Sequence, residues 1–318
     1  MKRSNGRFFI WVLCVLTAAG VLGDRSAYAG SAKKAETLHI KSYLDPGLQY
    51  FRAAEHAMLR TGSTVKIEII EGDWYDAKAP LTRPDVLRSV LNGDVVTTAT
   101  RRLTPEERSK GLDDAVLGHF AAVLFVHPSA PIEDVDSQKW PRALTPGQKF
   151  TWRDIANDNA AVVAKAVTKD RASAIDRSVT WSFPDATYAN FAKPLILTGA
   201  ITDALINAFP KVNPELTPLA STYLVADDPN KIGILGYNLV LTNQIHPLKP
   251  VRLLKIDGVY PSNQQIANGN YRFAAPVTVV FAAKAAKSPK HPIKKMLDFL
   301  KTEHALAAAS ERALVKPM

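Results

Sequence analysis

Cysteine is almost absent from this sequence. Cys14 is the only one among 318 residues, and it lies in an N-terminal apolar run that we expect to be removed. The remaining chain can then form neither a disulfide nor a thiolate metal site. Its stability must come from a hydrophobic core, and the 289 residues after residue 29 suffice for one large or two medium domains.

Short catalytic motifs are also missing. The sequence contains no G-x-S-x-G, H-E-x-x-H, G-x-x-x-x-G-K-[ST] or G-x-G-x-x-G pattern. Its seven histidines include no pair three or four residues apart, so no two of them share one helix face as metal ligands. We expect no enzyme activity, no metal and no cofactor. An exported hydrolase whose residues meet only in the fold stays open.

Long hydrophobic runs are confined to the N-terminus. Lys2 and Arg7 precede the apolar run Phe8–Val21, and small residues lead up to Ala29. This is the pattern of a secretory signal peptide, so we predict that residues 1–29 are a signal peptide and that the mature protein is periplasmic. No later apolar run approaches the ~18 residues of a membrane span.

The charge is basic without being concentrated. Residues 1–29 hold four basic residues and one acidic residue, so the rest of the chain keeps 36 Lys and Arg against 29 Asp and Glu, a formal charge of +7. This surplus suits an anionic ligand, but no dense block of the kind found in nucleic-acid-binding arms is present. We expect a small anion and no nucleic acid as partner; a merely solvated basic surface is the alternative.

Hydrophobic periodicity predicts alternating strands and helices in the first third of the chain. Leu38–Lys41 and Val65–Ile69 alternate as strands do, whereas Leu48–Leu59 and Pro84–Leu91 have apolar residues at helical spacing. A third strand would begin at Asp94. The order β-α-β-α-β predicts an α/β fold with a parallel sheet and covering helices.

The middle of the chain predicts a second unit. Phe120–Val126 is an apolar run typical of a buried strand, and a Pro-rich connection follows it. We expect a second α/β lobe with flanking helices. Residues 37–121 and 271–318 would form the first lobe, and residues 122–270 the second.

A polar strand tip is predicted between Asp94 and Glu107. Asp94 would begin the strand, and hydroxyls and arginines would follow at its end. Thr104, Pro105 and Glu107 have the spacing of a capping box, so a helix should begin there. The alternative is a strand-loop-helix connection with solvated charges.

A second candidate lies in the segment 72–76, which follows the second strand. Open α/β sheets bind ligands at the carboxyl ends of their strands, so Asp73 and Trp74 are candidate ligand contacts. The alternative is an aromatic turn that plugs the lobe.

Five segments, taken in chain order, resemble the phosphate-binding-protein-like family, the type II solute-binding proteins of phosphate ABC transporters. The first joins an Asp at a strand start to an "sRpLT-eE" run, and the third is similar to "pgaIGYvgy". The segments are Gly93–Glu107, Phe150–Ile155, Pro229–Tyr237, Asp257–Phe273 and Met296–Leu300.

The resemblance implies the two-lobed type II periplasmic-binding-protein fold, with mixed sheets, flanking helices and a hinge that lets the lobes close over an oxyanion. Asp94 matches the family's carboxylate, which would accept a proton-bearing oxygen of hydrogen phosphate. The segment from Arg177 resembles "RSdgSGTtwxF" with its three middle residues missing, and Asp73 and Trp74 stand where the family has Gly-Ser-Gly. The ligand-binding residues implied are Ser42, Asp73, Trp74, Asp94, Thr97, Arg177, Ser178 and Thr180.

We therefore expect a monomeric, exported binding protein that delivers phosphate or a related small oxyanion to the membrane subunits of an ABC transporter. A different class of function also stays open. The scaffold would then be a sensor or protein-interaction module, with Trp74 and Tyr75 filling the cleft.

Overall fold

A computed structural model describes residues 36–42, 45–71, 81, 83–143, 149–157, 173–182, 218–238, 240–241, 250–305, 307 and 314–315. They belong to one compact unit, Ala35–Met318. The expected signal peptide, residues 1–29, lies outside the described residues and stays a prediction.

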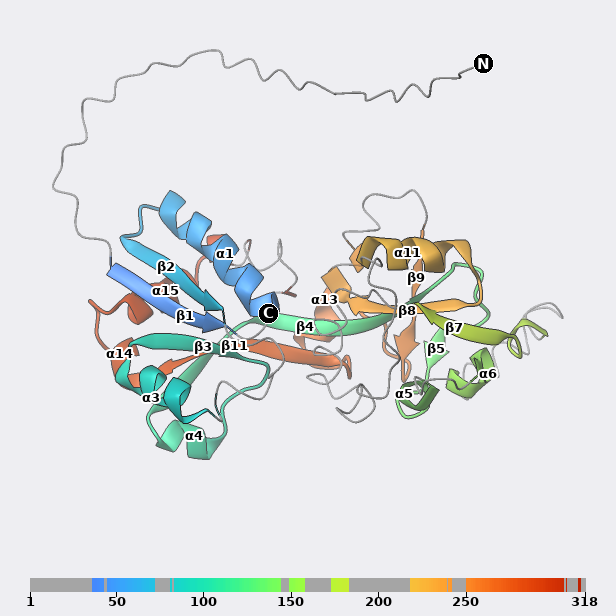
Figure 1. The fold of residues 1–318 in the computed structure, drawn as a ribbon, viewed down its shortest axis with the longest axis horizontal. Coiled ribbons are helices and arrows are strands. Elements are labelled where there is room, and N and C mark those ends of the chain that lie inside the picture. Colours follow the sequence, from blue (N-terminus) through green and yellow to red (C-terminus); the bar gives the residue numbers. More distant parts are fainter. Residues whose placement is uncertain are drawn as a thin grey trace, which may run out of the picture. The chain divides into compact units, whose positions relative to one another are not determined.

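The chain begins with the predicted β-α-β-α-β arrangement, which is confirmed. Its elements are β1 (Glu36–Ser42), α1 (Asp45–Arg60), β2 (Val65–Glu71), α3 (Pro84–Asn92) and β3 (Val95–Ala99). β1 lies between β2 and β3 and pairs with both in parallel (Figure 1). Leu48, Phe51 and Met58 bury one face of α1, but Leu59 is 55% exposed because it lies one residue round the helix from that face.

The helix start predicted at Thr104 is also confirmed. In α4 (Pro105–Ser109), the Thr104 hydroxyl accepts a hydrogen bond from Glu107 N (3.2 Å), and the Glu107 carboxylate accepts one from Thr104 N (2.8 Å). The preceding helix, α3, ends at Gly93, whose φ of 87° lies in the left-handed region that favours glycine.

One long strand, β4 (Leu112–Val126), joins the two parts of the sheet. Its residues Leu112–Ala121 pair antiparallel with β11 (Ala274–Ala282), and Ala122–Val126 pair antiparallel with β8 (Lys231–Gly236). The strand order is β2-β1-β3-β11-β4-β8-β7-β6, with β9 paired to β4 (Figure 1). The sheet is therefore mixed, with β4 shared by both of its parts.

The structure extends the strand predicted at Phe120–Val126 back to Leu112. The apolar run in the sequence is interrupted by Asp113, Asp114 and His119, so periodicity alone misses its first half. Asp114 is buried nonetheless, because arginines from outside the strand neutralise it, as described below.

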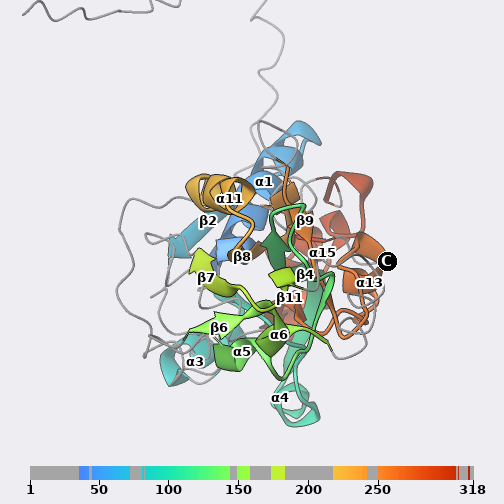
Figure 2. The ribbon, with the colours of Figure 1, turned by 90° about the vertical axis from the view of Figure 1, so that its right-hand side faces the viewer.

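The remaining elements are short. α11 (Pro218–Asp227) covers β7 and β8 (Figure 2). The others are β5 (Asp134–Val135), α5 (Trp140–Ala143), β6 (Phe150–Thr151), α6 (Trp152–Ile155), β7 (Ser178–Ser182), β9 (Arg252–Leu253), β10 (Lys255–Ile256), α13 (Asn263–Ala267), α14 (Ala283–Ala286) and α15 (Pro292–Phe299).

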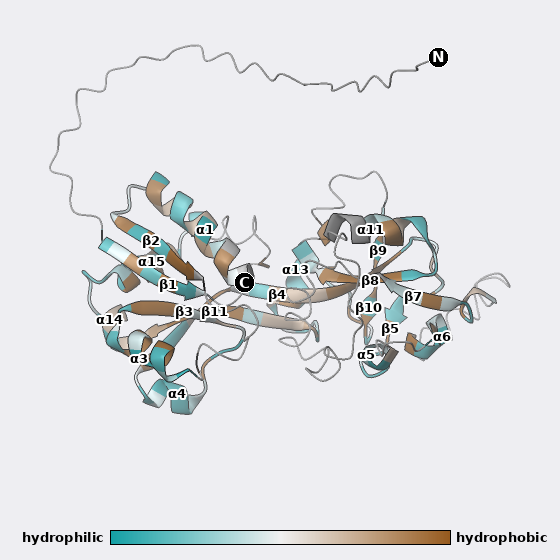
Figure 3. Cartoon of the chain, in the orientation of Figure 1, coloured by the Kyte–Doolittle hydropathy of each residue, from teal (hydrophilic) through white to brown (hydrophobic). Residues whose placement is uncertain are grey.

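Large side chains fill the core around β4. Trp140, Trp152, Tyr271 and Phe125 are each less than 2% exposed. β3 and β8 are mostly hydrophobic along their length, whereas α4 is hydrophilic (Figure 3). None of the helices in the described part of the chain is both long and apolar enough to cross a membrane.

Candidate functional site

Two buried hydroxyls meet at the carboxyl ends of β1 and β3. The register pairs Lys41 with Thr97, which places Ser42 level with Thr98. Ser42 Oγ lies 3.1 Å from Thr98 Oγ1, and the two residues are 4% and 0% exposed. Neighbouring parallel strands thus bring together two hydroxyls that lie 56 residues apart in the sequence.

The first turn of α1 lies directly against this hydroxyl pair. A Cβ atom on Gly47 would come within 2.9 Å of Thr98 Cγ2 and 3.4 Å of Ser42 Oγ. The glycine is therefore needed for close approach. Because the first backbone N–H groups of a helix have no partner within the helix, this turn combines amide donors with nearby hydroxyls.

Thr97, another expected ligand contact, makes a hydrogen bond within the sheet, and its role toward a ligand stays a prediction. Its side chain is fully buried, and Thr97 Oγ1 donates a hydrogen bond to Lys41 O (2.8 Å). This bond ties β3 to β1, so the hydroxyl proton of Thr97 serves the backbone of the neighbouring strand. Thr98, which the sequence reasoning missed, is the residue that meets Ser42.

The structure does not bring Asp94 to this pair. Asp94 is exposed and precedes β3, at the amino end of the strand, where its backbone N–H donates to Ser89 O. Asp94 lies four positions before Thr98, which corresponds to about 13 Å along an extended strand. The start and the end of one strand lie at opposite edges of a sheet, so the expected carboxylate lies far from the hydroxyls.

Arg177, Ser178 and Thr180 stay together, but away from Ser42 along the sheet. All three are exposed and lie at the start of β7, where Thr180 N donates to Asn230 O (3.0 Å). In the strand order, β11, β4 and β8 separate β7 from β3. Asp73 and Trp74 lie outside the described residues, so their roles stay predictions.

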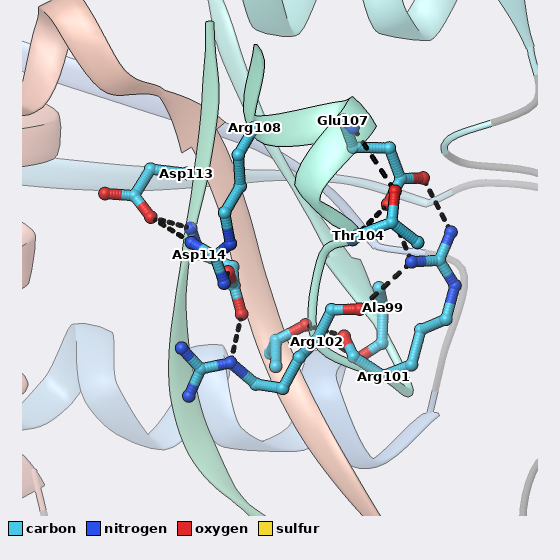
Figure 4. Close-up of polar contacts among 9 residues, drawn as sticks. Ala99, Arg101, Arg102, Thr104, Glu107, Arg108, Asp113 and Asp114 are labelled. Carbon is cyan, nitrogen blue, oxygen red and sulfur yellow. Dashed lines mark hydrogen bonds and ion pairs between the residues drawn. The ribbon is translucent and has the colours of Figure 1, made fainter. Parts of the chain in front are cut away.

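The arginines at the end of β3 are engaged in ion pairs (Figure 4). Arg101 donates two hydrogen bonds to the Glu107 carboxylate, at 2.7 and 2.6 Å. This pairing, opposed by burial and helped by Thr104, lowers the pKa of Glu107 to about 2. Thr278 Oγ1 donates to Arg101 O (2.9 Å) and anchors the turn. Arg101 thus holds the Glu107 carboxylate that takes part in the capping box of α4.

Two further arginines converge on one buried carboxylate (Figure 4). The Asp114 side chain is fully buried; Arg102 Nε lies 2.6 Å from its Oδ2, and Arg108 Nη2 contacts its Oδ1. Arg108 also donates to Asp113 Oδ1 (2.7 Å). These pairs fasten α4 and the preceding loop to β4, so both arginines have a structural role.

Neither a metal centre nor a cysteine site is found in the described part of the chain. No group of three or more His, Cys, Asp or Glu side chains there could hold a metal ion. The chemistry within reach of Ser42 and Thr98 is hydrogen bonding from hydroxyls and helix amides, which suits an oxyanion.

Comparison with known proteins identifies the fold. No protein-family model and no curated protein matches the sequence. PstS from Borrelia burgdorferi is similar in structure, with a TM-score of 0.63 and 12% identity over 89% of this chain and 99% of that chain. An ABC-type phosphate transport receptor from Vibrio cholerae has a TM-score of 0.59 and 14% identity over 89% of this chain and all of that chain.

A third similar structure, from Clostridium perfringens, was solved with bound phosphate; its TM-score is 0.54 and its identity 15%, over 89% of this chain and 100% of that chain. Identities this low establish the architecture alone. The chain therefore has the mixed α/β fold of type II periplasmic binding proteins, and its structural relatives include phosphate-binding proteins.

Proposed function

We propose that this protein is an exported solute-binding protein that captures phosphate or a related small oxyanion and passes it to an ABC transporter. The observation that carries the proposal is the first turn of α1 lying against the Ser42–Thr98 hydroxyl pair. Similarity of fold to phosphate-binding proteins, over about nine-tenths of the chain, supports it.

The chemistry of this corner fits an oxyanion. α1 has 16 residues, so its aligned peptide dipoles place a partial positive charge at its N-terminus. Backbone amides of the first turn, which have no acceptor within the helix itself, would donate to the oxygens of the anion. The hydroxyls of Ser42 and Thr98 lie beside this turn, and a hydroxyl can act as either donor or acceptor.

We further propose that residues 37–121 and 271–318 form one lobe and residues 122–270 the other. The change of partner within β4, from β11 up to Ala121 to β8 from Ala122, supports this division. Closure of two such lobes would complete the site with groups from the second lobe. The protein would act as a periplasmic monomer after loss of residues 1–29, without catalysis or a cofactor.

A second candidate function has its own support. Asp94 lies at the other end of β3, and Arg177 is exposed at the start of β7. Arg177 belongs to the proposed second lobe and would approach only on closure, whereas Asp94, which the resemblance also assigns to the anion, lies away from the hydroxyl pair within its own lobe. This favours, as the alternative, a diverged scaffold that acts as a sensor or protein-interaction module.

Ligand-dependent melting distinguishes the two. Phosphate, sulfate and molybdate are added separately to the purified protein, with buffer alone as control. At about 100 times the Kd, a bound anion adds roughly 2.7 kcal/mol to the free energy of unfolding. A selective rise in Tm with one anion supports the binding protein. Equal Tm values in all four samples would favour the interaction module, and phosphate release from a chromogenic ester would show a hydrolase instead.

A further inference from the structure

Two residues near the C-terminus are bonded to the middle of β4. Val315 N donates to His119 O and His119 N donates to Val315 O, both at 2.8 Å, which makes a one-residue antiparallel bridge. Leu314 and Val315 are 1% and 5% exposed. We refer to Leu314–Val315 as the C-terminal strap.

Gly118 provides the space for this strap. A Cβ atom on Gly118 would come within 2.8 Å of both Leu314 Cβ and Val315 O. Gly118 is not among the glycines with positive φ, so its backbone conformation is open to other residues. The glycine is therefore required by the close approach of the strap and not by a turn.

The strap pairs with the same edge of β4 as β8 does, but at His119, before the β8 ladder begins at Ala122. Ala122 N donates to Phe273 O, and Leu124 O accepts from Leu254 N, so these even-numbered residues direct their backbone bonds to one edge. His119 is an odd number of residues away and directs its bonds to the opposite edge. On the β11 side His119 is paired with Pro276 in the register without exchanging backbone hydrogen bonds.

This position coincides with the change of partner in β4. The ladder with β8 begins at Ala122, three residues beyond the strap, and the ladder with β11 has a register shift between Val277 and Thr278, next to Gly118. A strand is restrained by fewer backbone hydrogen bonds where its pairing with a neighbouring strand begins, ends or shifts register. The two backbone bonds of the strap thus add a partner to β4 on the part of that edge that β8 does not reach.

We propose that the C-terminal strap restrains bending of β4 between its β11-paired and β8-paired parts, and thereby limits the motion of one part of the sheet relative to the other. This rests on the proposed two-lobe division, but it does not depend on which ligand binds. The strap is a conformational restraint built from the end of the chain.

A double-mutant cycle tests the contact itself. Gly118→Ala is made in the chain from Gly30 to Met318 and in the same chain ending at residue 313. In the longer chain the added methyl collides with the strap, and the unfolding equilibrium constant should rise about tenfold. In the shorter chain the rise should be less than about threefold, since the colliding atoms are gone. Equal rises in both chains would overturn the proposal.

Hydrogen exchange and a pair of point variants test the restraint. Val315→Pro removes the N–H that bonds to His119 O, whereas Val315→Ala keeps both backbone groups and is the matched control. Exchange of β4 amides near His119 should accelerate about tenfold in the chain ending at residue 313, where the acceptor for His119 N is lost. It should change by less than about threefold in Val315→Ala.

Motion is measured with spin labels on Leu59→Cys and Leu224→Cys, at exposed positions of α1 and α11. The chain from Gly30 has no other cysteine. Without ligand, the distribution of distances between the two spin labels should be broader in Val315→Pro and in the chain ending at residue 313 than in the chain with the native strap. It should not be broader in Val315→Ala. Equal widths in all four proteins would refute the restraint. Phosphate titration of the same samples is independent, so failure of the binding proposal would be seen separately.

Discussion

Gly47→Ala tests whether the first turn of α1 rests on Thr98. Alanine is a better helix residue than glycine by about 1 kcal/mol, so propensity alone predicts a more stable protein. The new Cβ, however, would lie 2.9 Å from Thr98 Cγ2, closer than carbon atoms approach without displacement. Overpacking of this kind costs roughly 1–3 kcal/mol. The collision should outweigh the propensity, and we expect a net loss of up to about 2 kcal/mol.

The same substitution should cost less when the colliding methyl of Thr98 is removed. Thr98→Ser deletes Cγ2 and keeps the hydroxyl that meets Ser42. In that background the atoms nearest to the added Cβ are the Cβ of residue 98, at 3.3 Å, and Ser42 Oγ, at 3.4 Å, so Gly47→Ala should cost less than about 1 kcal/mol; the difference between the two backgrounds is the coupling energy. Urea unfolding of the four proteins measures the cycle.

Gly62→Ala is the control for this cycle. Gly62 has a φ of +74° and nothing within 4 Å of its added Cβ, so its cost arises from backbone strain alone. The cost of Gly62→Ala should be the same in the wild type and in the Thr98→Ser background. If Gly47→Ala also had the same cost in both backgrounds, the contact between α1 and β3 would be refuted. The proposed anion site at the first turn of α1 would then lose its support.

Two further predictions concern the ion pairs of α4. The pKa of Glu107 is depressed to about 2, mainly by Arg101, so its contribution is present above the ordinary carboxyl pKa and is lost as the pH falls toward 2. Glu107→Gln should therefore lower the free energy of unfolding by about 1–2 kcal/mol at pH 7, allowing for solvent screening, and by much less near pH 2.5; a difference that does not change with pH would contradict the pairing. Asp114→Asn should cost about 1–3 kcal/mol because the carboxylate is fully buried, whereas the half-exposed Asp113→Asn should cost less than about 1 kcal/mol in the same urea assay; equal costs would refute the role of burial.

Local features were the most predictable from the sequence. The capping box at Thr104 depends on residues within four positions of one another, and the structure has it as predicted. The β-α-β-α-β order follows from hydrophobic periodicity, which is also local. Such patterns need no knowledge of how distant segments pair.

The site was less predictable because it depends on strand register. Thr97 and Thr98 are adjacent hydroxyl residues, and only the pairing of β3 with β1 decides that Thr98 meets Ser42. The resemblance assigned Asp94 to the anion, but a motif does not say at which edge of the sheet a residue lies. Gly47 had a signal in principle, since a glycine in the third position of a helix has a propensity cost that close packing explains.

The beginning of β4 was missed for a related reason. Asp114 reads as a surface residue in the sequence, yet it is buried because Arg102 and Arg108 reach it from the loop before α4 and from α4 itself. A charged residue at a buried strand position breaks the alternation of apolar and polar residues on which a strand prediction depends. The arginines that neutralise it lie outside the strand, so the local sequence does not reveal them.

Isothermal titration with phosphate tests the central claim most directly. The proteins are the wild type, the double variant Ser42→Ala with Thr98→Val, and Thr222→Val, which removes a buried hydroxyl from α11 as a control. A hydrogen bond to a charged group contributes about 1.5–3 kcal/mol, so the double variant should bind at least about tenfold more weakly while the control binds as the wild type does. Binding of equal strength in all three proteins would place the anion elsewhere and contradict the account.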